Sequence, residues 1–309
     1  MAANYAGAGS SPDEQARRAE NTTAQPAKKA SRAGRDLRAA IVVGLFTGGL
    51  VVVTAVFAHR YWVVLCSGAA LVASHEVVRR LREAGYVIPV IPLLVGGQVT
   101  VWLTWPFHAA GAMAGFGGTV VVCMMWRLFM QDNSKRPEPF AGSPSANYLR
   151  DASATVFLAA WVPLFASFAA LLGYPHDGTG RVFCLMGTVV ASDVGGYAVG
   201  VLFGKHPMVP AISPKKSWEG LAGSMVFGIT AAILIATLLA HKPWWIGALL
   251  GVVLVFTCTL GDLVESQVKR DLGIKDMGRL LPGHGGLMDR LDGVLPSAVA
   301  TWTVLTLLR

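Results

Sequence analysis

Residues 84–126 read AGYVIPVIPLLVGGQVTVWLTWPFHAAGAMAGFGGTVVVCMMW and contain no lysine, arginine, aspartate or glutamate. A spanning helix needs about 20 mostly apolar residues, so this stretch is long enough for two of them. The sequence Trp105-Pro106-Phe107-His108 divides it, because proline removes a helix hydrogen-bond donor and aromatic residues favour the membrane interface. Residues 39–58 form another stretch without charge. These segments predict a protein that crosses a membrane repeatedly.

The overall composition agrees with this prediction. Of 309 residues, 53% are hydrophobic and only 14% are charged, whereas about a quarter of the residues in a soluble domain carry a charge. The four cysteines lie in apolar runs and form no C-x-x-C pair, which predicts buried side chains rather than a zinc site or disulfides. An ordinary cytosolic globule, a disulfide-stapled secreted module and a disordered chain are excluded.

Apolar runs of similar length recur along the chain and predict an all-α integral membrane protein. We expect a polytopic bundle of about nine transmembrane helices. The second run is short and ends at His75-Glu76. The predicted spans are 39–58, 61–75, 86–105, 109–129, 153–173, 182–203, 221–240, 244–262 and 291–308.

Lysine and arginine fall almost entirely on one side of this predicted topology. The N-terminal segment and four alternate loops hold 7, 3, 4, 3 and 5 of them, which is 22 of the 26 in the chain. Such an excess marks cytoplasmic segments, so we expect a multi-pass protein of the cell membrane with a cytoplasmic N-terminus. Topology also accounts for the net charge of +8, and no nucleic-acid partner is expected. The four loops are 76–85, 127–152, 204–220 and 263–290.

The first 38 residues differ from the rest. Residues 1–38 are rich in alanine, serine, arginine and lysine and hold almost no large apolar side chain, which predicts a disordered basic cytoplasmic tail. Residues 39–309 form the predicted transmembrane catalytic domain, which carries every candidate site residue.

Asp193 is the only acidic residue between positions 178 and 218, and it lies inside a predicted span. An unpaired carboxylate there is costly, so Asp193 should face a partner, water or a cation. Gly196 and Gly200 follow it four residues apart, and this spacing also fits a small-residue helix contact with an incidental acid. Both interpretations remain open.

A second polar segment precedes the seventh predicted span. Ser213 and Pro214 are typical of the N-cap and first turn of a helix. Lysines in that turn oppose the helix dipole, which suggests that Lys215 and Lys216 hold an anion such as a phosphate. Ordinary lysines of a cytoplasmic loop are the alternative.

The densest polar segment covers 261–292. Asp262 and Asp289 lie at the inner ends of adjacent predicted spans, and two carboxylates brought together repel unless a cation separates them. Mg²⁺ is the expected ion, because it typically takes one or two carboxylates plus substrate phosphates. If the eighth span continues inward, helical periodicity places four residues on one face. They are Asp262, Ser266, Lys269 and Gly273.

The same segment has a structural interpretation, in which aspartates cap the last span and Glu265 pairs with Lys269 at i,i+4. Capping explains neither His284 nor so many opposed charges. Glycines around His284 allow the backbone to approach a phosphate closely. These glycines are Gly283, Gly285 and Gly286, and the capping aspartates are Asp289 and Asp292.

The segment contains the pattern Ser266-x-x-Lys269-Arg270-x₄-Lys275-Asp276-x-Gly278-x-x-Leu281-Pro282-Gly283-His284-Gly285-Gly286-Leu287-x-Asp289-Arg290-Leu291-Asp292. This pattern resembles the signature of the phosphatidate cytidylyltransferases, also called CDP-diacylglycerol synthases. The stretch 213–220 is similar to a second motif of that family, which usually has threonine at Ser217. The stretch 193–204 is similar to a third, in which alanine is more usual at Gly196. The resemblance covers roughly 40–309.

The resemblance implies a catalytic groove at the cytoplasmic end of a multi-helix fold. The implied reaction converts CTP and phosphatidic acid to CDP-diacylglycerol and pyrophosphate. It brings two polyanions together, so negative charge must be offset. Asp262 and Asp289 are the implied Mg²⁺ ligands, with Asp193 and Asp276 as further candidates. The basic residues that would neutralise the triphosphate are Lys269, Arg270, Lys275 and Arg290.

Lys215 and Lys216 would hold the lipid phosphate or the leaving pyrophosphate. His284 would donate a hydrogen bond to a phosphate, since phosphatidate is already ionised and needs no general base. No residue stands out as an activated nucleophile, so no covalent intermediate is expected. The expected catalytic residues are Asp262, Asp289, Lys269 and His284. The expected substrate contacts are Ser213, Lys215, Lys216, Ser266, Arg270, Lys275, Gly283, Gly285, Gly286 and Arg290.

Two other functions fit parts of the pattern. A CTP-dependent lipid kinase would transfer the γ-phosphate and release CDP. A secondary transporter would also have intramembrane acids and glycine-interrupted helices, but the chain holds no matching second copy of 261–292. Small-residue helix faces would also allow two copies to pair as a homodimer, and a monovalent cation could assist Mg²⁺; the sequence decides neither point.

Overall fold

The computed structural model describes residues 33–57, 59–130, 147–278, 280 and 285–308. Within these residues the chain is helical apart from one two-stranded antiparallel hairpin. The elements are α2 (Ala33–Phe57), α3 (His59–Glu83), α4 (Val90–Trp102), α5 (Thr104–Phe129), α6 (Tyr148–Ala159), the π-helical turn η1 (Ala160–Leu164), α7 (Phe165–Leu172), α8 (Gly178–Phe203), β1 (Pro207–Val209), β2 (Ser213–Ser217), α9 (Trp218–Leu238), α10 (Trp244–Asp271), α11 (Met288–Leu291) and α12 (Val294–Leu307).

Each predicted apolar run falls on a helix, and six helical segments are long and apolar enough to cross a membrane. The protein is therefore an all-helical, multi-pass membrane protein, as the sequence predicted. Helix α2 begins at Ala33, inside the predicted tail; residues 1–32 lie outside the described residues, and the tail stays a prediction. The six segments are Tyr61–Glu83, Thr104–Phe129, Tyr148–Leu172, Gly178–Phe203, Trp218–Leu238 and Trp244–Asp271.

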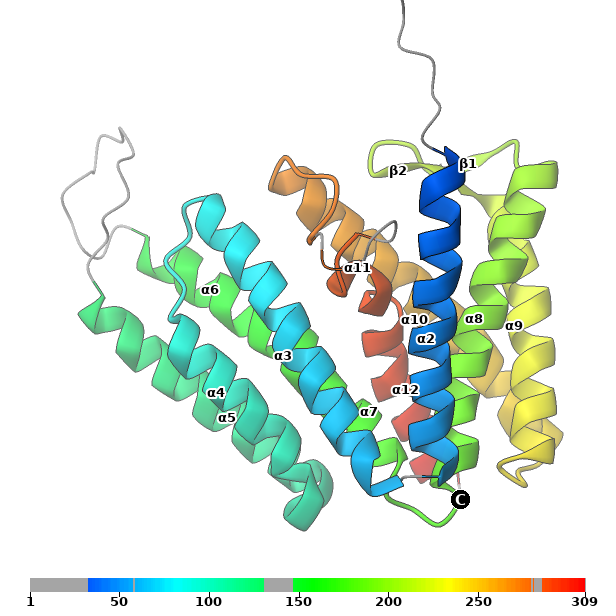
Figure 1. Ribbon diagram of the computed structural model, residues 1–309, viewed down its shortest axis with the longest axis horizontal. Helices are drawn as coiled ribbons and strands as arrows, with labels where there is room; N and C mark the ends of the chain where they lie inside the picture. The colour runs from blue at the N-terminus through cyan, green and yellow to red at the C-terminus, as the bar shows by residue number, and fades with distance from the viewer. Residues whose placement is uncertain (1–32, 58, 131–146, 279, 281–284, 309) are drawn as a thin grey trace, which may run out of the picture.

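The predicted break in the long uncharged stretch is present. Helix α4 ends at Trp102 and α5 begins at Thr104, and His108 has non-helical angles of φ 51° and ψ −136° inside α5. The chain turns closely here, because a Cβ on Gly111 would overlap the carbonyl oxygen of Leu103. The stretch therefore folds as two helices that lie side by side (Figure 1).

The described parts of four segments predicted to lie on the inner side gather at one end of the bundle (Figure 1). The start of α2, the turn after α3, the β1–β2 hairpin and the loop after α10 lie at the top of that view. The α7–α8 and α9–α10 connections lie at the opposite end. The alternation that the basic residues predicted is therefore present in the fold.

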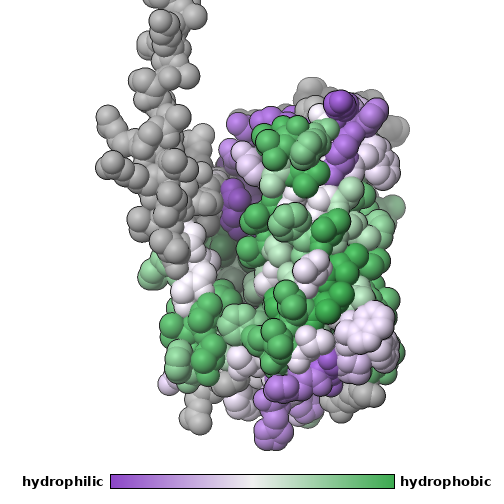
Figure 2. All heavy atoms as spheres, turned by 90° about the vertical axis from the view of Figure 1, so that its right-hand side faces the viewer, coloured by the Kyte–Doolittle hydropathy of each residue, from purple (hydrophilic) through white to green (hydrophobic). Residues whose placement is uncertain are grey.

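The surface between these ends is apolar. On the face seen in Figure 2, hydrophobic residues form a band between two hydrophilic ends. Helices α8 and α9 expose large side chains such as Tyr197, Leu202 and Val226. A soluble monomer rarely exposes so large an apolar area, but the hydrocarbon core of a bilayer, about 30 Å thick, covers such a band.

Helices α8 and α9 pack through small residues. A Cβ on Gly196 would overlap the Ser224 hydroxyl, and a Cβ on Gly200 would contact α9 in the next turn. Ser224 also donates a hydrogen bond of 2.8 Å to the Ser192 carbonyl. The small-residue helix contact is confirmed, and it fixes the helix that carries Asp193 against α9.

Candidate active site

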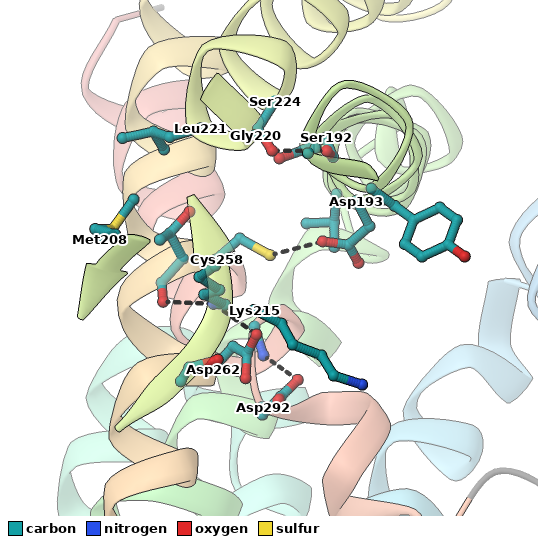
Figure 3. Close-up of a pocket in the computed structure, with 18 of the residues that line it drawn as sticks. Ser192, Asp193, Met208, Lys215, Gly220, Leu221, Ser224, Cys258, Asp262 and Asp292 are labelled. Atoms are coloured by element: carbon teal, nitrogen blue, oxygen red, sulfur yellow. Dashed lines mark hydrogen bonds and ion pairs between the residues drawn. The ribbon is translucent and has the colours of Figure 1, made fainter. Parts of the chain in front are cut away.

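A cavity of about 590 Å³ is lined by α8, α9, α10, the β1–β2 hairpin and the segments next to α11 and α12. In Figure 3, Asp193 of α8 approaches it from one wall, while Asp262 and Asp292 lie together on another. The charged residues that line it are Asp193, Lys215, Lys216, Asp262, Lys269, Asp276, Asp289, Arg290 and Asp292.

Asp262 and Asp292, which line this cavity, and the buried Glu265 behind them form an acidic cluster whose carboxylates lie close enough to share one cation. Ligand oxygens of Asp262, Glu265 and Asp292 all lie within 4.8 Å of one another. Carboxylates at this spacing repel one another unless a cation or a proton comes between them. Oxygen ligands of this kind suit a hard divalent ion.

A close helix crossing brings these carboxylates together. A Cβ on Gly261 would overlap the carbonyl oxygen of Asp292, and a Cβ on Gly293 would overlap the Cys258 sulfur. Glycine at both positions lets the two backbones approach, as small residues do in membrane helix packing. Asp262 directly follows Gly261, so this backbone contact sets how near its carboxylate lies to Asp292.

Glu265 supplies the strongest sign of a cation. Its side chain is fully buried, and one oxygen, Oε2, forms an ion pair with Lys269. The other oxygen, Oε1, has no hydrogen-bond partner among the described residues. An unpaired buried carboxylate oxygen is costly, and either a bound cation or a proton shared with Asp292 would satisfy it. The residues present therefore fit a divalent metal ion.

Asp289 lies in a different set of contacts. Its Oδ2 accepts hydrogen bonds from the N–H groups of Gly286 at 2.7 Å and Met277 at 3.0 Å. Lys269 Nζ lies 3.1 Å from Oδ1. Burial alone raises the pKa of Asp289, but the hydrogen bonds from Gly286 and Met277 and the Lys269 ammonium hold it below its ordinary value. Lys269 thus links the acidic cluster, through Glu265, to Asp289. The role of Asp289 as a metal ligand stays a prediction.

The predicted N-cap role of Ser213 is wrong. Ser213 lies in β2, where it pairs with Val209 of β1, and this pairing keeps the backbone extended. Helix α9 begins at Trp218 instead, and the Ser217 hydroxyl caps it by accepting a hydrogen bond of 3.1 Å from the Gly220 N–H. The helix-dipole argument for an anion at the lysines therefore does not apply.

The two lysines nevertheless line the cavity from β2. Lys216 Nζ lies 2.5 Å from Asp262 Oδ2 and 3.4 Å from the Thr259 carbonyl. Lys215 is exposed. The hairpin thus places one lysine in contact with the acidic cluster and a second lysine beside it.

The other predicted site residues are divided between the cavity and its surroundings. Asp193 accepts a hydrogen bond of 3.6 Å from the Cys258 thiol. Ser266 donates one of 3.2 Å to Asp262, on the helix face that periodicity predicted. Arg270 donates one of 3.4 Å to the Ile212 carbonyl and so links α10 to the hairpin. The predicted residues outside the described lining are Ser266, Arg270, Lys275, Gly285 and Gly286.

Gly283 and His284 lie outside the described residues, so their roles stay predictions. Two members of the acidic cluster were not predicted as metal ligands. Glu265 was interpreted as half of a helix ion pair and Asp292 as a cap. A signal for Glu265 was present, because it follows Asp262 by three residues and shares its helix face.

A profile of the Cytidylyltransferase family matches residues 38–308. A phosphatidate cytidylyltransferase of Mycobacterium leprae is 73% identical over 311 residues, which cover 100% of both chains. Proteins of the same name from Mycobacterium bovis and Mycobacterium tuberculosis are 70% and 71% identical, over 100% and 99% of this chain and 100% and 92% of theirs.

The fold and the cavity define a membrane-embedded enzyme whose polar site lies at one end of a helix bundle. The chain belongs to the phosphatidate cytidylyltransferase family and is a nucleotidyltransferase.

Proposed function

We propose that the cavity transfers the cytidylyl group of CTP to phosphatidate and releases CDP-diacylglycerol and pyrophosphate. The observation that carries this proposal is the acidic cluster of Asp262, the buried Glu265 and Asp292, with Lys216 in direct contact with Asp262. An anionic cluster for a cation and adjacent basic side chains are what two phosphate-bearing substrates require. The names of the relatives support the same substrates.

The three carboxylates would hold Mg²⁺, and Asp289, Asp193 and Asp276 are further candidates for ligands. When bound, such an ion would supply positive charge that offsets the charge of the substrate phosphates. Lys269 and Glu265 orient each other by their ion pair, so Lys269 is held where it reaches Asp289. We further propose that a monovalent cation assists this centre.

The chain's basic residues would position the two substrates. An oxygen of the ionised lipid phosphate attacks the α-phosphorus of CTP, and the bond from that phosphorus to the pyrophosphate oxygen breaks. No proton has to be removed from the lipid, so no general base is required. Lys215 and Lys216 would hold the lipid phosphate or the leaving pyrophosphate. Lys269 and Arg290, with His284, would contact the triphosphate.

In this proposal the bundle crosses the membrane nine times and the cavity faces the cytoplasm. The turn after α3, the hairpin and the loop after α10 lie at the same end of the bundle (Figure 1), and these are segments whose basic residues the positive-inside rule assigns to the cytoplasm. We also propose a homodimer, for which light scattering of the detergent-purified protein is the test. A mass of one protomer would contradict it.

The decisive experiment uses detergent-purified protein, phosphatidate, Mg²⁺ and CTP labelled at the α-phosphate. We expect label in CDP-diacylglycerol and one pyrophosphate released for each lipid converted. Release of CDP with a phosphorylated lipid would instead show a lipid kinase. Absence of any conversion without a membrane gradient would favour a transporter.

A further inference from the structure

Helix α3 contacts the loop that follows α10, although the two are far apart in the sequence. Glu76 Oε2 accepts a hydrogen bond of 2.9 Å from the Met288 N–H. One turn later, Arg80 Nε donates a hydrogen bond of 2.8 Å to the Met277 carbonyl, and its Nη2 lies 3.4 Å from the Asp276 carbonyl. These contacts join α3 to both ends of the loop.

The loop is shaped to receive the Glu76 carboxylate. A Cβ on Gly278 would overlap Glu76 Oε1, and a Cβ on Gly286 would come within 2.7 Å of Glu76 Oε2. The same two glycines face each other across the loop, since a Cβ on Gly286 would come within 2.6 Å of the Gly278 nitrogen. Glycine at both positions therefore lets the two sides of the loop close around the carboxylate.

Glu76 is buried, and it lies outside the substrate cavity. Glu76 is 9% exposed, and its Oε1 has no hydrogen-bond partner among the described residues. Glu76 and Arg80 are also absent from the described lining of the cavity. A buried carboxylate with an unpaired oxygen contributes little to the stability of the fold, because its desolvation offsets its interactions. Stability therefore does not explain why Glu76 contacts the loop.

We infer that Glu76 and Arg80 are positioning residues that fix the described ends of this loop, 276–278 and 285–290, against the cavity. Asp289 holds the Met277 and Gly286 N–H groups from the cavity side. Glu76 and Arg80 hold the Met288 N–H and the Met277 carbonyl from the α3 side. Hydrogen bonds therefore hold the loop from both sides, and they set the positions of three loop residues that line the cavity. They are Asp276, Asp289 and Arg290.

This inference rests on the proposed function and makes a separable prediction about the two substrates. The loop carries two further candidates for metal ligands, Asp276 and Asp289, and the triphosphate contact Arg290, whereas β2 carries the lysines that would hold the lipid phosphate or the leaving pyrophosphate. A displaced loop should therefore impair use of Mg²⁺ and CTP and leave binding of phosphatidate unchanged. Misplacement of a catalytic group by about 1 Å can cost roughly 100-fold in rate.

The test compares Glu76→Ala, Glu76→Gln and Arg80→Ala in the full-length, detergent-purified protein. We expect Glu76→Ala and Arg80→Ala to lower kcat roughly tenfold or more and to raise the half-saturating concentration of Mg²⁺–CTP. The KM for phosphatidate should stay within about twofold. Glu76→Gln should recover most of the activity, because its amide oxygen still accepts the Met288 N–H.

Arg79→Ala is the matched control, because Arg79 is exposed and pairs with Glu83 on the same helix. It should behave like the wild type. Hydrogen exchange should accelerate in 276–290 of Glu76→Ala and stay unchanged in the hairpin 205–217. If Glu76→Ala fails to fold, Arg80→Ala carries the test, since its side chain is 20% exposed.

Wild-type kinetics in both alanine variants, or an equal rise of both KM values, would overturn the inference. Failure of the proposed function has a different signature, because the wild-type protein itself would then form no CDP-diacylglycerol.

Discussion

Glu265 and Asp289 show how the surroundings of a carboxylate separate two roles. Glu265 is fully buried with one oxygen unpaired among the described residues, and a carboxylate oxygen of this kind suits a hard cation. Asp289 accepts hydrogen bonds from two backbone N–H groups and pairs with a lysine. It therefore organises the loop as well as lining the cavity. Substitution of each should therefore give a different dependence on Mg²⁺.

Glu265→Gln should raise the half-saturating Mg²⁺ concentration roughly tenfold or more, because the amide keeps the shape but removes one ligand charge. Activity should return in part at higher Mg²⁺. Titration of turnover with Mg²⁺ measures both effects. Asp271→Asn is the control, since Asp271 is an exposed acid of the same helix that bonds to Gln267. An unchanged Mg²⁺ requirement in Glu265→Gln would exclude Glu265 as a ligand.

Asp289→Asn should lose turnover by roughly 100-fold at every Mg²⁺ concentration. The amide oxygen cannot replace the charge that pairs with Lys269, and the amide nitrogen cannot accept a backbone N–H. Size-exclusion chromatography in detergent should show a folded protein. Wild-type turnover in this variant would remove Asp289 from the catalytic centre.

Lys215→Ala should mainly raise the KM of a substrate, with phosphatidate as the expected one, by roughly tenfold if one charge-assisted hydrogen bond is lost. Initial rates measured against each substrate separate the two constants. Lys205→Ala is the control, because Lys205 belongs to the same basic segment but does not line the cavity. Unchanged constants for both substrates would place Lys215 among the lysines that only set topology.

Among the elements, the crossing of α10 past the segment before α12 matters most to the site. The Gly261 and Gly293 contacts bring Asp262, Glu265 and Asp292 within reach of one cation. The β1–β2 hairpin then adds Lys216 from a third direction. Helical periodicity predicts which residues share a face of α10, but it does not predict which residue of another segment lies opposite.

Gly261→Ala tests this crossing. The added methyl group would overlap the Asp292 carbonyl, so the segments must separate at a cost of about 1–3 kcal/mol. We expect a lower Tm in detergent and a weaker response to Mg²⁺. Gly68→Ala is the control, because a Cβ at that position of α3 meets nothing within 4 Å. Equal behaviour of the two variants would contradict the role of the crossing.

At the scale of the whole molecule, the hairpin and the loop after α10, which both supply lining residues of the site, lie at the same end of the bundle (Figure 1). Catalysis at that end requires it to face the compartment that contains CTP. Opposite ends of the bundle can be distinguished by labelling, because the four natural cysteines are buried.

Lys205→Cys, beside the hairpin, and His176→Cys, in the α7–α8 turn, should react with a membrane-impermeant maleimide from opposite sides. Both positions are exposed. In intact cells we expect labelling of the position-176 variant alone, and in inverted vesicles labelling of the position-205 variant alone. The reverse pattern would place the cavity outside the cytoplasm.

The sequence by itself determined that the chain is an all-helical, multi-pass membrane protein, and it grouped the loops that carry most basic residues on one side of the predicted topology. Apolar runs and the distribution of lysine and arginine are local properties, since length and transfer free energy decide whether a segment crosses a bilayer. The signature 266–292 likewise marked the segment that lines the cavity. Even so, local signals misplaced the start of α9, because β1 keeps Ser213 extended.

Only the tertiary structure decided which carboxylates meet. It grouped Asp262 with Glu265 and Asp292 and brought Glu76 of α3 onto the loop that contains Asp289. The physical reason is that contacts between helices depend on how closely their backbones approach. Small residues at particular crossings set that approach, and a pattern within one segment holds no information about the segment packed against it.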